Sequence, residues 1–303
     1  SDAMVVTDKT FTGIPLVDLA GPLGAAVCRA MSEAKRFLDD RDTNQLLGLI
    51  GKTIQDLAVG KPIDKAVMQK SFGGGRVAQT DDLLAGRGLF YITEQGKLFL
   101  DCTAGHYQMS WGYDHPVLTR IVHDGLAAGI VPDNHSNIPQ WPVKRLAQRL
   151  IEAANSDCPQ LQQGDFSKAM KSRTRLNTAL LGIATGSVAC EAALKIMLMH
   201  HERVKRSRPA VFVVLDGNYH GTGFFSQNLR GMWKPFIRNM KVVAVQPNDG
   251  GQLEQIFSRY GEQITGFWAE PVMMNREAIL VETEYLQLAR KLTRRVGALM
   301  AVD

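Results

Sequence analysis

The sequence predicts an α/β fold in which a mostly parallel sheet is covered by helices, with an extra helical segment at the N-terminus. From Thr178 onward, short apolar runs alternate with segments of helical spacing. The runs are apolar on both faces, which is typical of parallel strands that helices cover on both sides. The five predicted strands are TALLGIA, AVFVVLD, KVVAVQ, ITGFWAE and GALMAVD, and the predicted helices lie at about residues 187–203, 249–261 and 283–296.

Up to about residue 80 the chain has the pattern of helices joined by polar segments. Both GAAVCRAMSEAKRFLDD and NQLLGLIGKTIQDLAVG carry apolar residues at helical spacing, and SFGGGRV, residues 71–77, then interrupts the pattern. Residues 1–80 are therefore predicted to form an N-terminal helical extension. Its first three residues, Ser-Asp-Ala, precede Met4 and are interpreted as a cloning remnant.

A β-hairpin is predicted next. In GRGLFYITEQGKLFLDCTAG the apolar residues recur with period two, and Glu94-Gln95-Gly96 supplies a polar turn. Helices are predicted at about residues 116–129 and 139–154. The hairpin and the first of these helices define a region at residues 81–130, and residues 131–303 form the domain that contains the parallel sheet.

Composition excludes several classes of protein. The 303 residues are 45% hydrophobic and 21% charged, which is ordinary for a globular protein and excludes disordered and fibrous chains. The net charge of +5 includes a basic cluster at residues 200–208, but no aromatic residues are interleaved with it, so nucleic acid is not an expected partner. No apolar run approaches the roughly eighteen residues of a membrane span, and no signal-peptide pattern opens the chain. We expect a cytoplasmic protein with no membrane partner.

The four cysteines predict neither disulfides nor a metal site. Cys28, Cys102, Cys158 and Cys190 show no C-x-x-C spacing, and none has a histidine at ligand spacing. We interpret them as reduced structural thiols and expect no bound metal.

The candidate site lies at the carboxyl ends of the predicted strands, where open α/β sheets bind their ligands. The residues there are Thr185-Gly186-Ser187, Asp216 through Gly221, Gln246, Glu270 and Asp303. Thr185-Gly186-Ser187 joins a predicted strand to a helix, and the N-terminus of a helix offers unpaired amides and a partial positive charge to a phosphate. From these residues alone, a plain N-cap turn remains an alternative to a phosphate site.

Four segments, in order along the chain, resemble class III pyridoxal-phosphate-dependent aminotransferases, the group of the ornithine, acetylornithine and γ-aminobutyrate aminotransferases. LDCTAGHYQMSWGYDHPVL is similar to the family's L-D-x-x-x-G…G-x-x-H-P segment, and ATGSVACEAALKI to its S/T-G-[ST]-x-A-x-E-x-A-x-K segment. GNYHGTGFFSQNLRG resembles the Tyr-His-Gly segment. The last segment, from FWAEPV to ALMAVD, resembles the strand ending in Glu-Pro-Val, a helix, and the strand ending in Asp. The resemblance covers residues 86–303 and implies the large domain of fold type I.

The resemblance implies a site for pyridoxal 5'-phosphate at the carboxyl ends of the strands. Gly186 and Ser187 would bind the phosphate, Tyr219 would stack on the pyridine ring, and His220 would shape the same loop. Asp303 would pair with the ring nitrogen and hold it protonated, so that the ring accepts electrons during catalysis.

The other implied roles concern the ring edge and the substrate. Glu270 would support the polar edge of the cofactor ring from the neighbouring strand. His106 and Tyr107 lie in the hairpin region, residues 81–130, which the resemblance assigns to the small-domain and substrate region; they would line the substrate pocket or a polar rim.

The sequence departs from the family at two points. Where several members carry a Glu that gates a carboxylate-binding arginine, this chain has Asn275, with Glu277 two residues on. The family's catalytic lysine is also missing, because it would follow Asp303, the end of a strand that is apolar on both faces. We therefore expect the large domain at residues 131–303 to be incomplete, with a lysine beyond residue 303 holding the cofactor and with Lys195, Lys234 and Lys241 uninvolved.

The resemblance implies a homodimeric aminotransferase that moves an amino group from an amino acid or amine donor to a keto acid or aldehyde acceptor. An aminomutase or racemase with the same cofactor is the nearest alternative. A dinucleotide-dependent oxidoreductase is a rival of different chemistry, although G-x-G-x-x-G is absent from the chain. A non-catalytic binding protein is the third alternative.

Overall fold

The computed structural model describes residues 21–57, 83–130, 141–157, 176–180, 182–205, 209–231, 237 and 240–303. The chain divides into two compact units, Ser1–Pro132 and Asp133–Asp303. In the described part of the chain no helix is both long and apolar enough to cross a membrane.

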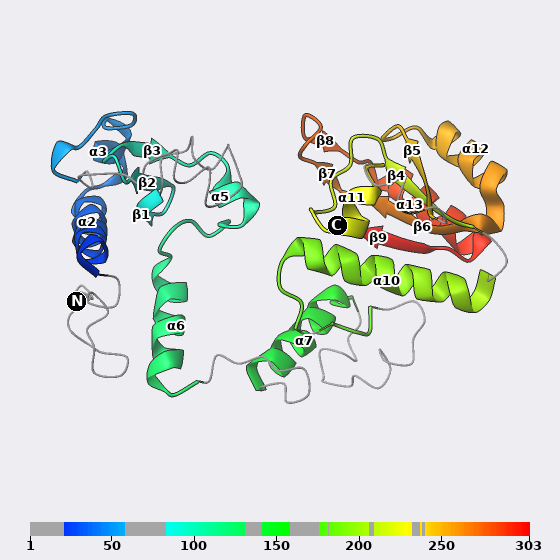
Figure 1. The fold of residues 1–303 in the computed structure, drawn as a ribbon, viewed down its shortest axis with the longest axis horizontal. Helices are drawn as coiled ribbons and strands as arrows, with labels where there is room; N and C mark the ends of the chain where they lie inside the picture. The colour runs from blue at the N-terminus through cyan, green and yellow to red at the C-terminus, as the bar shows by residue number, and fades with distance from the viewer. Residues whose placement is uncertain are drawn as a thin grey trace. The chain divides into compact units, whose positions relative to one another are not determined.

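The first unit contains a small antiparallel sheet against a helix. Its strands β1 (Leu83–Arg87), β2 (Phe90–Thr93) and β3 (Leu98–Leu100) lie in that order, and helix α2 (Gly21–Asp39) packs against them (Figure 1). The predicted hairpin is confirmed: β2 and β3 pair antiparallel, and Gly96, at φ +73°, donates its N–H to the Thr93 carbonyl at 2.8 Å. The helix and the sheet share one core, made of Ala30, Ala34, Leu38, Leu46, Leu57, Leu84, Phe90, Ile92 and Leu98. A domain boundary at residue 80 stays a prediction.

The second predicted helix of the N-terminal segment is much shorter than expected. Helix α3 (Thr43–Leu47) starts at a capping box on Asp42 and ends at Gly48, and a single 3-10 turn, η1 (Gln55–Leu57), follows. Between α3 and η1, Gly51 adopts a φ of +77°, and its N–H donates a hydrogen bond to the Leu98 carbonyl at 2.8 Å. Pairing with the sheet edge therefore replaces the helical hydrogen bonds that the apolar spacing predicted.

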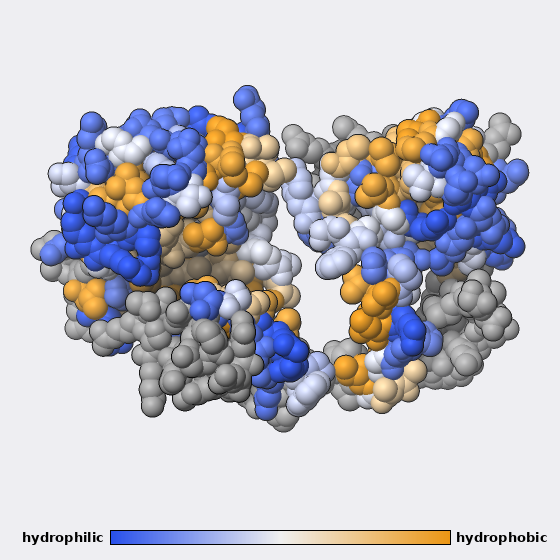
Figure 2. All heavy atoms as spheres, turned by 180° about the vertical axis from the view of Figure 1, so that it is seen from behind, coloured by the Kyte–Doolittle hydropathy of each residue, from blue (hydrophilic) through white to orange (hydrophobic). Residues whose placement is uncertain are grey.

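Two further helices lie among the described residues of this unit. Helix α5 (Ala104–Tyr107) is one turn long, and α6 (Pro116–Ala127) begins with Pro116 in its first turn, where a missing N–H is tolerated. None of the α6 side chains is buried. Figure 2 shows apolar side chains at the surface along this helix, and the exposed ones are Val117, Leu118, Ile121, Val122 and Leu126.

The second unit contains the predicted parallel sheet. Strands β4 (Ala210–Leu215), β5 (Met240–Val245), β6 (Ile264–Ala269) and β9 (Leu299–Val302) form it in the order β5-β4-β6-β9, and every neighbouring pair is parallel. All side chains of β4 and β6 are buried, because these two strands lie in the middle of the sheet. Four of the five predicted strands are therefore confirmed.

Helices cover both faces of this sheet (Figure 1). Helix α10 (Gly186–Lys205) packs on one face through Cys190, Leu194 and Met197, which contact Phe212, Val214 and Trp268. Helices α12 (Gly250–Tyr260) and α13 (Thr283–Val296) pack on the other. The predicted helices at 187–203, 249–261 and 283–296 are thus confirmed within a few residues. The remaining elements are α7 (Trp141–Ala154), α11 (Phe224–Asn228), η3 (Gly261–Gln263), β7 (Val272–Met273) and β8 (Ile279–Leu280).

Two predictions about strands are wrong. The described residues of TALLGIA, 178–180 and 182–184, form no strand, and Leu180 and Ile183 are 57% and 37% exposed, so these two side chains do not lie in the sheet core. The apolar pattern of GALMAVD predicts a strand buried on both faces, yet β9 is only partly buried and Val302 is 56% exposed. Among the described residues β9 pairs with β6 alone, so one side of the strand lacks a covering neighbour.

Candidate functional site

Helix α10 begins at a corner that is open to an anion. The Thr185 hydroxyl accepts the Val188 N–H at 3.3 Å and its carbonyl accepts the Ala189 N–H at 3.2 Å, which leaves the amides of Gly186 and Ser187 outside this cap. A Cβ built on Gly186 would meet no atom of the described residues within 4 Å, so the space beside this glycine is open. Because the N-terminus of a helix carries a partial positive charge, this corner suits a phosphate.

The loop after β4 packs directly on this corner. The Ser187 Oγ accepts the Thr222 N–H at 3.0 Å. Gly221 has φ +95°, and a Cβ at this position would lie 2.6 Å from the Ser187 Oγ and 2.7 Å from its Cα. Only a glycine therefore fits between the loop and the helix, and the hydroxyl hydrogen of Ser187 stays available to an anion.

Glu270, at the end of β6, holds the same loop from the other side. Its Oε2 accepts the Tyr219 N–H at 2.8 Å, and the residue is only 8% exposed. Burial raises the pKa of Glu270, while the hydrogen bond from Tyr219 acts in the opposite direction. The Tyr219 side chain itself is 37% exposed, and the guanidinium carbon of Arg230 lies 5.7 Å from its ring centroid. The carboxylate thus positions the Tyr219 backbone, while the side chain remains partly exposed beside Arg230.

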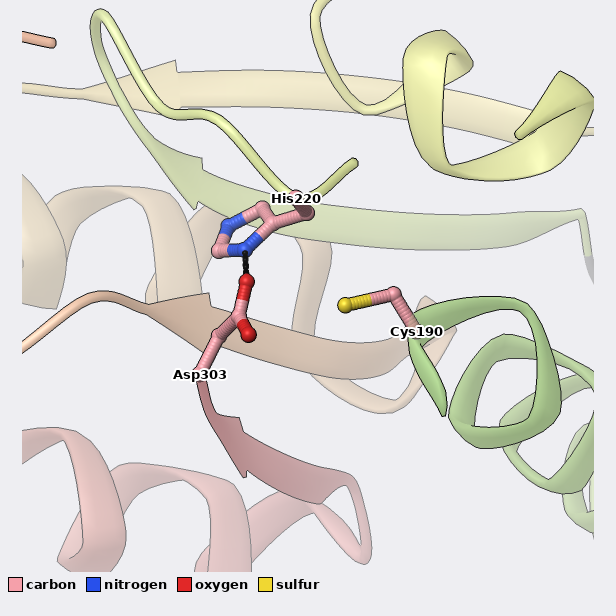
Figure 3. Close-up of side chains that lie close together, drawn as sticks. All are labelled: Cys190, His220 and Asp303. Carbon is pink, nitrogen blue, oxygen red and sulfur yellow. Dashed lines mark hydrogen bonds and ion pairs between the residues drawn. The ribbon is translucent and has the colours of Figure 1, made fainter. Parts of the chain in front are cut away.

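His220 and Asp303 form a hydrogen-bonded pair at the centre of the site (Figure 3). Their Nδ1 and Oδ2 atoms are 2.7 Å apart, the histidine is completely buried, and its ring lies 5.0 Å from that of Trp268, centroid to centroid. A carboxylate can only accept a hydrogen bond, so the proton lies on Nδ1. This hydrogen bond lowers the pKa of Asp303 against the opposing effect of burial. Asp303 is therefore an ionised carboxylate whose side chain is still 34% exposed.

Cys190, on the first turns of α10, completes this cluster. Its Sγ points toward Asp303, and the ligand atoms of Cys190, His220 and Asp303 lie within 4.8 Å of one another (Figure 3). These residue types can bind zinc, but two ligands of one tetrahedral zinc ion lie roughly 3.3 Å apart, given bonds of about 2.0–2.3 Å. The 2.7 Å separation of His220 and Asp303 is shorter and matches a hydrogen bond. As arranged, His220 and Asp303 form a hydrogen-bonded pair, and Cys190 lies beside it.

The structure brings six of the predicted site residues to one place. Four elements supply them: the start of α10, the loop after β4, and the ends of β6 and β9, all at the carboxyl edge of the sheet. The six are Gly186, Ser187, Tyr219, His220, Glu270 and Asp303. His106 and Tyr107 belong to the first unit, in α5, so their assignment to the substrate pocket stays a prediction.

Two residues near the site are not predicted from the sequence. From the sequence, Cys190 is interpreted as a purely structural thiol. Its position four residues after Gly186, about one helical turn further along α10, is the feature of the sequence that could have placed it near the site. Arg276 belongs to no motif, yet it donates to the Asp216 carboxylate at 3.0 Å and to the Gln246 Oε1 at 2.9 Å. It joins the turn between β7 and β8 to the ends of β4 and β5. Its neighbours Asn275 and Glu277 lie in that turn, where Glu277 has φ +53°.

The lysines expected to take no part in cofactor binding lie away from this cluster or outside the described residues. The Lys241 ammonium, at the amino end of β5, is 4.7 Å from the Tyr260 ring centroid. Lys195 lies further along α10 than Cys190, in a surface groove with Met199 and Glu202. Lys234 lies outside the described residues.

Comparisons with known proteins identify the family of the chain. The family model described as "Aminotransferase class-III" matches residues 79–303. A glutamate-1-semialdehyde 2,1-aminomutase from Aeropyrum pernix is 24% identical over 219 residues, which cover 72% of this chain and 46% of that protein. The mitochondrial ornithine aminotransferase of Arabidopsis thaliana is 23% identical over 218 residues, 69% of this chain and 40% of that protein.

The fold has solved counterparts. The crystal structure of ornithine aminotransferase from Toxoplasma gondii superposes with a TM-score of 0.60 at 19% identity, over 81% of this chain and 54% of that one. The chain spans about half the length of the curated relatives it matches. Because the family match covers most of its residues, this chain belongs to the class III aminotransferases.

Proposed function

We propose that the protein to which this chain belongs carries out pyridoxal-phosphate-dependent transamination between an amino acid or amine donor and a keto acid or aldehyde acceptor. One observation carries the proposal: the ionised Asp303, fixed by His220, lies on the same edge of the sheet as the open N-terminal corner of α10. An anion-binding corner beside a fixed negative charge matches a ligand with a phosphate at one end and a basic nitrogen at the other.

The residues present fit this cofactor. The open space at Gly186, where a Cβ would meet nothing, leaves room for the phosphate against the helix amides, and the Ser187 hydroxyl has a hydrogen to donate. The exposed ring of Tyr219 offers a stacking surface, and the partly exposed Asp303 an acceptor for the ring nitrogen. When bound, the cofactor supplies an electron sink for the carbanion formed at the substrate Cα.

The chain's own groups keep the site ready for that chemistry. His220 donates to one Asp303 oxygen and orients the carboxylate, so the negative charge stays on Asp303 and holds a proton on the ring nitrogen. Two hydrogen bonds hold the loop after β4 in place. The Tyr219 N–H ties it to Glu270 after β6, and the Thr222 N–H ties it to Ser187 at the start of α10. Such prearranged charges and dipoles are among the largest contributions to enzymatic rates.

Asp303→Asn in the full-length protein tests the proposal. The neutral amide should leave the cofactor bound, as visible absorbance reports, but slow the half-reaction with an amino donor by about a thousandfold, equivalent to ~4 kcal/mol. Asp216→Asn is the matched control, because Asp216 is also an acid at the carboxyl edge of the sheet but pairs with Arg276. An Asp303→Asn enzyme that turns over within a fewfold of wild type contradicts the proposed role.

Aminomutase activity is the second candidate, favoured by the similarity to the enzyme from Aeropyrum pernix. The two reactions differ in the fate of the amino group. A transaminase passes ¹⁵N from a labelled donor to a different acceptor molecule, whereas an aminomutase retains the nitrogen in the isomerised product. Mass spectrometry of both products after turnover with labelled donor decides between them.

The remaining parts of the proposal concern the whole protein. The exposed apolar side of α6 supports a homodimer, because it leaves Ile121 and Val122 more than half exposed in the single chain. The free thiols of Cys28, Cys102 and Cys190 support a reducing, cytoplasmic location.

Borohydride reduction followed by peptide mapping identifies the lysine that holds the cofactor; we propose that it is none of Lys195, Lys234 and Lys241.

A further inference from the structure

The thiol of Cys190 lies beside a carboxylate at the heart of the site. Cys190 is 5% exposed, and its Sγ is within 4.8 Å of the nearest ligand atoms of both His220 and Asp303. It approaches from α10, whereas His220 approaches from the loop after β4 (Figure 3). Side chains from two different elements thus approach Asp303, and His220 is the one that the structure shows hydrogen-bonded to it.

The thiol can serve Asp303 only as a hydrogen-bond donor. Burial, followed by the charge of Asp303, raises the pKa of Cys190 to about 12, so the sulfur keeps its proton at neutral pH. The other acids around it, Glu191 on α10 and Glu270 directly after β6, act in the same direction. Asp303 has its Oδ2 occupied by the His220 Nδ1–H, and it can accept further donors.

We propose that Cys190 is a positioning residue for Asp303, whose carboxylate it holds by donating its S–H from the side of α10 while His220 donates from the loop. Two donors from separate elements restrict rotation of the carboxylate and leave its exposed side turned toward the ligand. The inference rests on the proposed function for its catalytic consequence, but formation of the proposed hydrogen bond between Cys190 and Asp303 does not depend on the cofactor.

The first test reads the thiol directly, in the full-length protein without cofactor. The S–H stretching band lies in an infrared window free of other protein absorption, and the difference between wild type and Cys190→Ala isolates the band of this one cysteine. We expect it at lower frequency than the band of exposed Cys102, isolated in the same way with Cys102→Ala. Asp303→Ala should move the Cys190 band up toward that of Cys102.

Asp303→Asn provides the same measurement if the alanine variant does not fold, because the loss of charge weakens the acceptor and should also raise the frequency. A Cys190 band that coincides with that of Cys102, or that does not respond to either Asp303 variant, overturns the inference. Since no cofactor is present, this outcome leaves the proposed transaminase function untouched.

The second test measures the consequence in the loaded enzyme. Cys190→Val keeps a buried apolar group of similar shape but removes the donor, whereas Cys190→Ser keeps a donor. We expect the half-reaction rate to fall about tenfold in the valine variant, as for loss of one hydrogen bond to a charged group, and to return to within about threefold of wild type in the serine variant. Equal rates in the valine and serine variants, with equal melting temperatures, overturn the positioning role. Absence of cofactor binding in the wild type would instead contradict the proposed function.

Discussion

Replacement of Gly221 by alanine should separate the loop after β4 from helix α10. The added Cβ would lie 2.6 Å from the Ser187 Oγ and 2.7 Å from its Cα, which is closer than carbon atoms approach in folded proteins. The backbone at Gly221 also has φ +95°, a conformation that residues with a Cβ rarely adopt. Either the loop or the start of the helix must move.

Both effects contribute to the magnitude. An unfavourable backbone conformation costs about 1–3 kcal/mol, and overpacking of a close contact about 1–3 kcal/mol. Their sum, about 2–6 kcal/mol, is a large part of the total stability of a domain, which is about 5–15 kcal/mol. If the loop moves to relieve the clash, the loss of stability is smaller, but the hydrogen bond between Thr222 and Ser187 breaks. We then expect weaker cofactor retention in place of the full loss of stability.

Urea unfolding and cofactor retention after gel filtration should be measured together in the full-length protein. Gly297→Ala is the matched control: Gly297 ends α13 at φ +65°, and a Cβ there meets nothing within 4 Å, so this variant suffers the backbone strain without the clash. We expect Gly221→Ala to lose at least about 1 kcal/mol more than the control, or to release its cofactor. A Gly221→Ala protein that matches Gly297→Ala in stability and retains the cofactor would refute the close packing of loop and helix.

Three other changes have defined outcomes. Ser187→Ala should weaken cofactor binding by about 1 kcal/mol without abolishing it, because the hydroxyl is one phosphate donor in addition to the helix amides. Equilibrium dialysis measures this affinity, and an unchanged value contradicts the assignment of Ser187 to the phosphate. Tyr219→Leu should lose only the stacking contribution, about 0.5–1.5 kcal/mol, and keep most of the activity, so a folded but inactive variant would indicate a chemical role for the phenol. The lowered pKa of Asp303 means that its contribution to stability is present above the unfolded-state pKa of about 3.9 and is lost as the pH falls through the lower folded-state value. In urea unfolding between about pH 5 and pH 2.5, Asp303→Asn should therefore lose less stability than wild type, and parallel curves would contradict the pairing with His220.

The local pattern of the sequence by itself determines the elements of the second unit and the place of the site. Alternation of apolar runs with helical segments predicts the four parallel strands and three helices that form, because period and burial are local properties of the chain. The carboxyl ends of parallel strands share one edge of their sheet. The order of the strands and their end residues is therefore enough to place Gly186, Tyr219, Glu270 and Asp303 near one another.

Only the tertiary structure decides which groups touch. Apolar spacing alone does not show that residues 51–54 pair with a sheet edge, that the described residues of TALLGIA form no strand, or that β9 is partly exposed, since each depends on neighbours distant in the chain. The approach of Cys190 to Asp303 joins residues 113 positions apart, and the bond of Arg276 to Asp216 joins residues 60 apart. A side chain's partner is set by how helices and loops pack across the sheet, which no local period encodes, so the pairing of His220 with Asp303 and the approach of Cys190 to them exist only in the folded chain.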